Sequence, residues 1–131
     1  LIEINSDKKN CNFLGSLTNE NLALFFDAID VLIIPSYEES GPLVGLEAMA
    51  AGKIIISTKV GAMAERLASL EGHWFAVENL ATLESCINKV NALSLDNYQA
   101  AAMLLRKRYM DEYSFDAVAL KYQKLIRSIL H

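Results

Sequence analysis

Two glutamates, Glu39 and Glu47, are the residues whose type and spacing could do chemistry in this chain. They lie in the segment 35–47, PSYEESGPLVGLE, between an apolar run and a helix-like pattern. Carboxylates accept hydrogen bonds, so a ligand rich in hydroxyl groups would satisfy both of them. In a parallel α/β sheet, ligands bind at the strand ends where such a loop begins. The segment is therefore the candidate binding site.

Glu47 is the only charged residue between positions 42 and 51, and on a helix it falls on a stripe between the apolar Leu43 and Ala51. A carboxylate buried there alone would be costly or would take up a proton. We therefore expect it to accept hydrogen bonds from donors such as ribose hydroxyls. The alternative is that this stripe faces water at one end of the helix.

The start of the same helix offers main-chain donors to an anion. Pro42 suits the first helical position, with Gly41 before it as the N-cap. The unpaired amides of Gly41, Leu43 and Val44, reinforced by the helix dipole, would bind a diphosphate. Pro42 itself has no amide to give.

Glu39 lies on the loop before this helix. From there it could reach sugar hydroxyls beyond the phosphates, while Glu47 stays at the nucleoside. The alternative for Glu38 and Glu39 is a solvated acidic turn, since exposed carboxylates are common.

The segment resembles the donor-binding signature of the retaining glycosyltransferases of family four, also called glycosyl transferases group 1. The resemblance rests on the proline and serine that end the strand and on two glutamates separated by seven residues. It continues through residues 47–53, EAMAAGK, and weakly into 60–62, VGA, and Glu65. Looser similarity runs from 13–15, FLG, to 113–115, YSF.

The resemblance implies a retaining hexosyltransferase of the two-domain GT-B fold, with residues 1–131 as most of its C-terminal nucleotide-sugar-binding domain. Glu39 would be the catalytic-site residue that orients the donor sugar, and Glu47 would hold the ribose. Stabilisation of the leaving diphosphate would drive transfer, with no metal and no cofactor. The main-chain amides implied to approach the sugar and diphosphate are those of Ser40, Gly41, Leu43 and Val44.

The chain departs from the family pattern at several positions and lacks one of its parts. Ser40 stands in place of a glycine, Gly45 in place of a larger apolar residue, and Ala62 in place of a second glycine. The family's diphosphate-neutralising arginine and lysine come before the point where this chain starts, and Leu1 is not a methionine. We expect a fragment that is inactive alone, with the acceptor, a glycan or lipid, bound through a missing N-terminal domain.

A hypothesis of a different class stays open: a non-catalytic nucleotide-binding module or degenerate homologue. The sequence excludes other classes more firmly. A net charge of −4 gives no basic field for nucleic acid. Neither a P-loop nor a dinucleotide-binding glycine motif is present. The two cysteines fit a reduced, cytoplasmic setting, and no apolar run is long enough to cross a membrane.

Apolar periodicity predicts an α/β fold for this chain of 131 residues, 53% of them hydrophobic. The expected architecture is a Rossmann-like parallel sheet with helices on both faces, followed by C-terminal helices. Two apolar runs read as strands buried on both faces. The ranges expected as strands are 12–15, 31–34, 54–57 and 73–77, and those expected as helices are a segment capped by Thr18, then 42–51, 62–70, 80–93, 97–110 and 115–130.

Two features near the C-terminus allow more than one interpretation. The basic run Arg106, Lys107 and Arg108 could touch acidic lipid, which leaves peripheral membrane association of the parent enzyme open, or could simply complement the helix dipole. The apolar face of the helix 115–130 could pack on this domain, cross to a missing domain or mediate dimerisation.

Overall fold

The computed structural model describes residues 11–68, 70 and 72–130. Three parallel strands form one sheet in the order β1-β2-β3. The strands are β1 (Val31–Ile34), β2 (Ile54–Ser57) and β3 (His73–Trp74). The expected parallel α/β sheet is confirmed. Residues 1–10 lie outside the described residues, and so does the chain start at Leu1 on which the expectation of a fragment partly rested.

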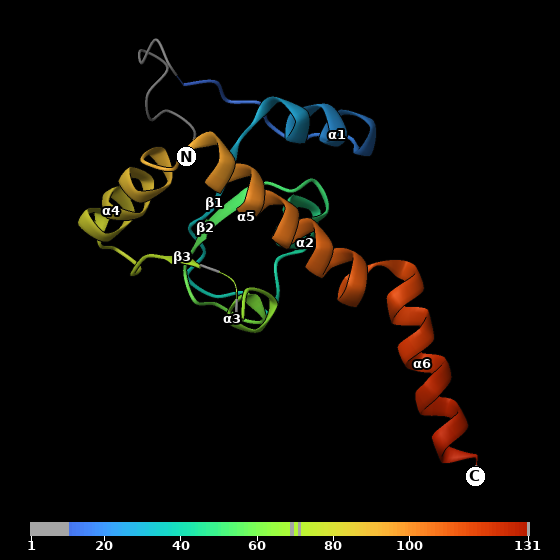
Figure 1. Ribbon diagram of the computed structural model, residues 1–131. Coiled ribbons are helices and arrows are strands. Elements are labelled where there is room, and N and C mark those ends of the chain that lie inside the picture. The colour runs from blue at the N-terminus through green and yellow to red at the C-terminus, as the bar shows by residue number, and fades with distance from the viewer. Residues whose placement is uncertain (1–10, 69, 71, 131) are drawn as a thin grey trace.

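Four helices alternate with the strands, and the C-terminal part is helical throughout (Figure 1). The four are α1 (Asn19–Ala28), α2 (Leu43–Ala50), α3 (Met63–Arg66) and α4 (Leu80–Asn91). They are followed by α5 (Leu95–Arg108), the π-helical turn η1 (Tyr109–Tyr113) and α6 (Phe115–Ile129). Since α2 joins two neighbouring parallel strands, it is the crossover that a parallel pair requires.

Helices cover both faces of the sheet because successive side chains of β2 point to opposite sides. Ile55 packs in a core with Met49 of α2 and Leu105 of α5. Ile54 and Ile56 pack in a second core with residues of α4. All three isoleucines are 2% exposed or less, so β2 is buried on both faces, as predicted.

The expectation of burial on both faces is wrong for β1. Ile33 is 40% exposed, because the helices cover its face of the sheet incompletely at β1, which is the edge of the described sheet. An open pocket of about 610 Å³ lies beside it, between β1 and residues of α4 and α5.

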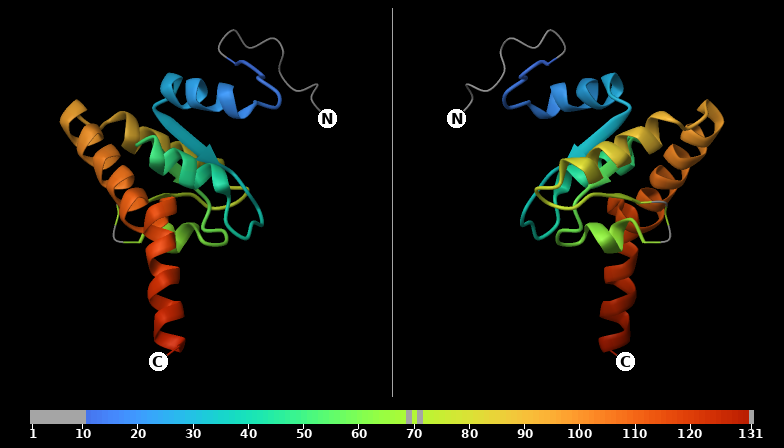
Figure 2. Two further views of the ribbon diagram at one scale, coloured as in Figure 1. Left: turned by 90° about the vertical axis from the view of Figure 1, so that its right-hand side faces the viewer. Right: turned by 90° about the vertical axis from the view of Figure 1, so that its left-hand side faces the viewer.

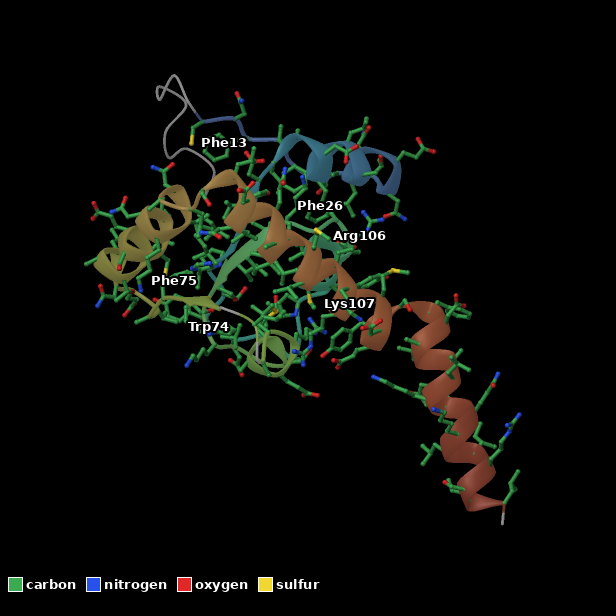
Figure 3. All side chains as sticks on the ribbon, viewed as in Figure 1. Phe13, Phe26, Trp74, Phe75, Arg106 and Lys107 are labelled. Atoms are coloured by element: carbon green, nitrogen blue, oxygen red, sulfur yellow. The ribbon has the colours of Figure 1, made fainter. Side chains whose placement is uncertain are left out.

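The strand expected at 12–15 is absent. Phe13 and Leu14 are 62% and 58% exposed, and neither pairs with a described strand. An extended segment becomes a strand only when a neighbour takes up its main-chain hydrogen bonds. Figure 3 shows Phe13 on the extended chain before α1.

Several element ends also differ from the predicted ones. Pro42, not Gly41, is the N-cap of α2, because its ψ of 123° is extended and the helix begins at Leu43. The strand β3 is shorter than 73–77, because the chain turns at Ala76, whose carbonyl accepts a hydrogen bond from the Asn79 amide. The helix α3 is a single turn rather than the whole of 62–70, of which residue 69 lies outside the described part.

The basic run at the end of α5 is tied to η1. Lys107 forms an ion pair with Asp111, and Arg108 Nε lies 3.1 Å from Glu112 Oε1. Figure 3 shows Arg106 and Lys107 on this part of α5. Two of the three basic residues therefore have partners within the chain.

The helix α6 extends away from the rest of the molecule (Figure 2). It has no buried residue, and Phe115 and Ile129 are 86% and 72% exposed. Only residues 117–119 near its start are half-buried, and from Leu120 onward its apolar face does not pack on the described part of this domain. Among the described residues, no helix combines the length and apolar character needed to cross a membrane.

Candidate functional site

The candidate site is built on the loop 35–42, which leaves the end of β1 and enters α2. Pro35 follows the last residue of β1, and Pro42 precedes the first residue of α2. Glu38, Glu39 and Ser40 at the middle of this loop are exposed. The carboxylate of Glu39 makes no hydrogen bond or ion pair with another described residue, so it is available to a ligand.

The segment after β2, residues 58–66, holds this loop by its main-chain carbonyls. Thr58 Oγ1 donates to the Ser36 carbonyl at 2.6 Å. The Ala62 amide donates to the Ser40 carbonyl at 3.1 Å. Since β1 and β2 are adjacent and parallel, their following segments meet at the same edge of the sheet.

Arg66, the last residue of α3, makes the third contact of this kind. Its Nη1 donates to the Pro42 carbonyl at 2.7 Å, and its Nη2 lies 3.5 Å from the Gly41 carbonyl. A guanidinium can bond to two acceptors at once because its donors form a planar fork. Arg66 on α3 therefore holds the main chain in place where the loop enters α2.

Gly61 allows the two segments to touch main chain to main chain. Its φ is +48°, and a Cβ placed on it would lie 2.3 Å from the Glu39 carbonyl oxygen and 2.4 Å from that of Ser40. No side chain fits at such distances. In the sequence, only the weak match at 60–62 pointed to Gly61.

The start of α2 presents free main-chain donors, as predicted. The amides of Gly41, Leu43 and Val44 donate to no other residue in the described ranges, whereas the Gly45 amide bonds to the Pro42 carbonyl at 3.1 Å. Unpaired amides and the helix dipole favour a bound anion.

Glu47 lies on α2 and is half-buried, between Leu46 and the fully buried Ala48. Its carboxylate forms no hydrogen bond or ion pair with any residue that the structure describes. Neither of the two settings weighed from the sequence, full burial or a fully solvated stripe, is found. A half-buried carboxylate with unused lone pairs is suited to accept from a ligand.

Gly45 is buried in α2, and its small size has a structural reason. A Cβ on it would lie 2.9 Å from Met63 Sδ, and Met63 is fully buried. The flexible thioether of Met63 fills the space that a larger residue would take. Met63 therefore compensates for the absence of a larger apolar side chain at Gly45, where the chain departs from the family pattern.

A second pocket, of about 600 Å³, adjoins the loop at the carboxyl ends of the strands. Tyr37, Lys59 and Trp74 are among its lining residues, and Lys59 Nζ lies 5.7 Å from the centre of the Trp74 ring. A hydrogen bond with Glu78, and secondarily burial, raises the pKa of Tyr37. This links the site loop to the segment after β3.

The structure brings most of the predicted site residues together. Residues 39–44 are contiguous on the loop and the first turn of α2, and Glu47 follows one helical turn after Leu43. Sequence reasoning missed Thr58, Gly61 and Arg66, which touch the loop from the neighbouring segment. Their one available signal was position, since each follows the strand β2 that pairs with β1.

A family model and individual relatives were found for this chain, and they agree with one another. The model of the family "Glycosyl transferases group 1" matches residues 2–108. Lipopolysaccharide 1,2-N-acetylglucosaminetransferase of Salmonella typhimurium is 30% identical over 96% of this chain and 32% of its own length. D-inositol 3-phosphate glycosyltransferase of Pseudarthrobacter chlorophenolicus is 41% identical over 41% of this chain and 13% of its own.

A solved structure supports the same assignment. Sucrose-phosphate synthase from Thermosynechococcus elongatus superposes with a TM-score of 0.78 at 28% identity, covering 91% of this chain and 30% of that protein. The chain thus spans about a third or less of the length of these relatives. The predicted fold class and the predicted resemblance are both confirmed. The chain belongs to the glycosyl transferases group 1 family.

Proposed function

We propose that residues 39–47 bind the nucleotide-sugar donor of a glycosyltransferase that retains the configuration of the transferred sugar. One observation carries the proposal: free amides at the start of α2 stand one helical turn from a half-buried carboxylate with no partner among the described residues. A nucleoside diphosphate combines the two matching groups, an anion and a hydroxyl-bearing ribose.

The helix geometry sets the spacing between these two groups. Glu47 is four residues after Leu43, so the two side chains lie on the same face of α2. One turn of helix rises about 5.4 Å. A diphosphate at the amides of Gly41, Leu43 and Val44 would therefore place the ribose hydroxyls near the Glu47 carboxylate.

Glu39 and Ser40 precede the anion site and would lie on the sugar side of the diphosphate. Glu39 would orient hydroxyls of the donor sugar rather than attack it, and the Ser40 amide would approach the same sugar. Stabilisation of the departing diphosphate by oriented donors lowers the barrier to transfer. The acceptor would then attack from the face that the diphosphate leaves.

The other parts of the active enzyme, including the acceptor site, would lie on a polypeptide segment outside residues 1–131. We propose that residues 1–131 form most of one domain, and that a glycan or lipid-linked acceptor binds on another domain. The exposed apolar face of α6 and the edge strand β1 are surfaces that further chain would cover.

Cys11 and Cys86 are both free thiols, which supports a reducing, cytoplasmic location.

The proposal is tested by screening the full-length protein against UDP-, GDP- and ADP-sugars in thermal-shift assays. Nucleotide-linked N-acetylglucosamine comes first, because the Salmonella relative is named for transfer of that sugar. A donor that raises the melting temperature is then used for transfer assays, with the anomeric configuration of the product read by NMR. A product of inverted configuration would refute retention, and no stabilisation by any donor would refute the donor site. Stabilisation without turnover would favour a non-catalytic nucleotide-binding module.

A further inference from the structure

We propose that Arg66 is a positioning residue of this site, which turns the amide of Leu43 toward the diphosphate by holding the carbonyl of Pro42. The inference rests on the proposed function, since it concerns how the donor's diphosphate is held. It assigns a role to a cation outside the loop 35–42, on the helix α3, where the resemblance to the family is weak and names only Glu65.

The contacts of Arg66 place it firmly on the entry to α2. Nη1 donates to the Pro42 carbonyl at 2.7 Å, and Nη2 is 3.5 Å from that of Gly41. A Cβ on Gly41 would meet Nη2 at 2.9 Å, so the guanidinium lies directly against the loop. Arg66 forms no ion pair with an acidic residue of the described part, and these carbonyls are the acceptors it bonds to.

The direction of the Leu43 amide follows from peptide geometry. The structure has no cis peptide bond among its described residues, and in a trans peptide the carbonyl and the next amide point in opposite directions. The Pro42 carbonyl accepts from Arg66 Nη1 at 2.7 Å and also from the Gly45 amide of α2 at 3.1 Å. The Leu43 N–H, which belongs to the same peptide unit, therefore points away from Arg66.

The same relationship holds one step earlier on the loop. The Ser40 carbonyl accepts from the Ala62 amide at 3.1 Å, so the Gly41 N–H of that peptide unit points away from Ala62. Two of the three amides assigned to the anion are thus oriented through their carbonyls by the segment after β2. Arg66 supplies the only charged contact of the two.

The charge of Arg66 has an effect beyond orientation. A charge-assisted hydrogen bond to the Pro42 carbonyl polarises the peptide unit and makes the Leu43 N–H a stronger donor. A lysine would keep the charge but present a single ammonium group, without the planar fork that contacts both Gly41 and Pro42. The effect of substitution should therefore depend on the guanidinium as well as on its charge.

The test uses the full-length protein and calorimetric titration with UDP, GDP and ADP, taking forward whichever diphosphate binds. The matching nucleoside is measured by displacement of that diphosphate. For Arg66→Ala we expect about tenfold weaker binding of the diphosphate, equivalent to about 1.4 kcal/mol, and nucleoside affinity within twofold of the original. The diphosphate affinity of Arg66→Lys should fall between that of the unsubstituted protein and that of Arg66→Ala. Arg106→Ala, at an exposed arginine of α5 (Figure 3), is the control and should change neither affinity.

The outcomes separate the inference from the proposed function. Equal losses for nucleoside and diphosphate, or diphosphate affinity unchanged in Arg66→Ala, would overturn the positioning role and leave the donor site standing. If the unsubstituted protein binds none of the diphosphates, the proposed function and this inference both fall. If Arg66→Ala does not fold, Arg66→Lys decides alone: a loss confined to the diphosphate supports the role, and any other result overturns it.

Discussion

The hydroxyl of Thr58 donates a hydrogen bond of 2.6 Å to the carbonyl of Ser36, 22 residues earlier in the chain. Thr58 is only 2% exposed, and the bond joins the ends of β1 and β2 where the candidate site begins. We predict that Thr58→Val, which keeps the shape but removes the donor, lowers the free energy of unfolding by about 1–2 kcal/mol. Urea unfolding measures this. Thr58→Ser retains the hydroxyl and should lose less than half as much.

Gly61 lies where the two segments that form the site meet main chain to main chain. In Gly61→Ala the new Cβ would meet the Glu39 and Ser40 carbonyl oxygens at 2.3 and 2.4 Å, and main-chain atoms cannot move aside as side chains do. The loop 35–42 must shift. We predict a loss of about 3 kcal/mol or more in the free energy of unfolding, and a loss of nucleotide binding at temperatures where the variant is still folded.

The control for this change is Gly15→Ala. Gly15 also has a positive φ, of +66°, but a Cβ there would have nothing within 4 Å. Only the left-handed backbone strain remains, which costs about 1–2 kcal/mol. If the two variants proved equally stable, the collision at Gly61 would not be the cause of the loss.

The parts of the fold that the sequence predicts well are those determined by local composition. The runs 31–34 and 54–57 have the predicted bounds because apolar β-branched residues between polar or turn residues specify short buried strands. The loop before α2 was also found, because Pro35 and Pro42 restrict the chain locally, but α2 begins one residue later than predicted. The free amides at the start of α2 follow directly from helix geometry.

The features that were missed depend on contacts between segments distant in the chain. Arg66 donates a hydrogen bond to the carbonyl of Pro42, 24 residues earlier in the chain. The residues around Arg66 in the sequence do not predict that partner. The π-helical turn η1 (Tyr109–Tyr113) ends with a bond from the Ser114 amide to the Tyr109 carbonyl, and no apolar periodicity in the sequence predicts a turn of this kind. The absent strand at 12–15 has an apolar pattern but lacks a neighbouring described strand.

Glu47 is predicted to accept hydrogen bonds from ribose. Glu47→Ala should weaken binding of the nucleotide to the full-length protein by about 1–3 kcal/mol, because the ribose hydroxyls lose their acceptor. Calorimetry with the diphosphate identified by screening measures the change. Glu84→Ala removes an exposed carboxylate from another helix, α4, and should leave affinity unchanged. Undiminished binding in Glu47→Ala would remove Glu47 from the ribose site.

Glu39 is predicted to contact the sugar alone, so its substitution should separate turnover from nucleotide binding. In Glu39→Ala we expect kcat for the nucleotide sugar to fall by about 100-fold or more, since misplacing the reacting sugar slightly has an effect of that size. Affinity for the free diphosphate should stay within about threefold, because the amides of α2 and Glu47 are intact.

The matched control is Glu38→Ala, the neighbouring exposed glutamate on the same loop, which should keep most of the turnover. If Glu38→Ala and Glu39→Ala lost turnover equally, the loop's net negative charge would matter rather than the position of one carboxylate. If Glu39→Ala lost diphosphate affinity as steeply as turnover, Glu39 would belong to the nucleotide site and not to the sugar.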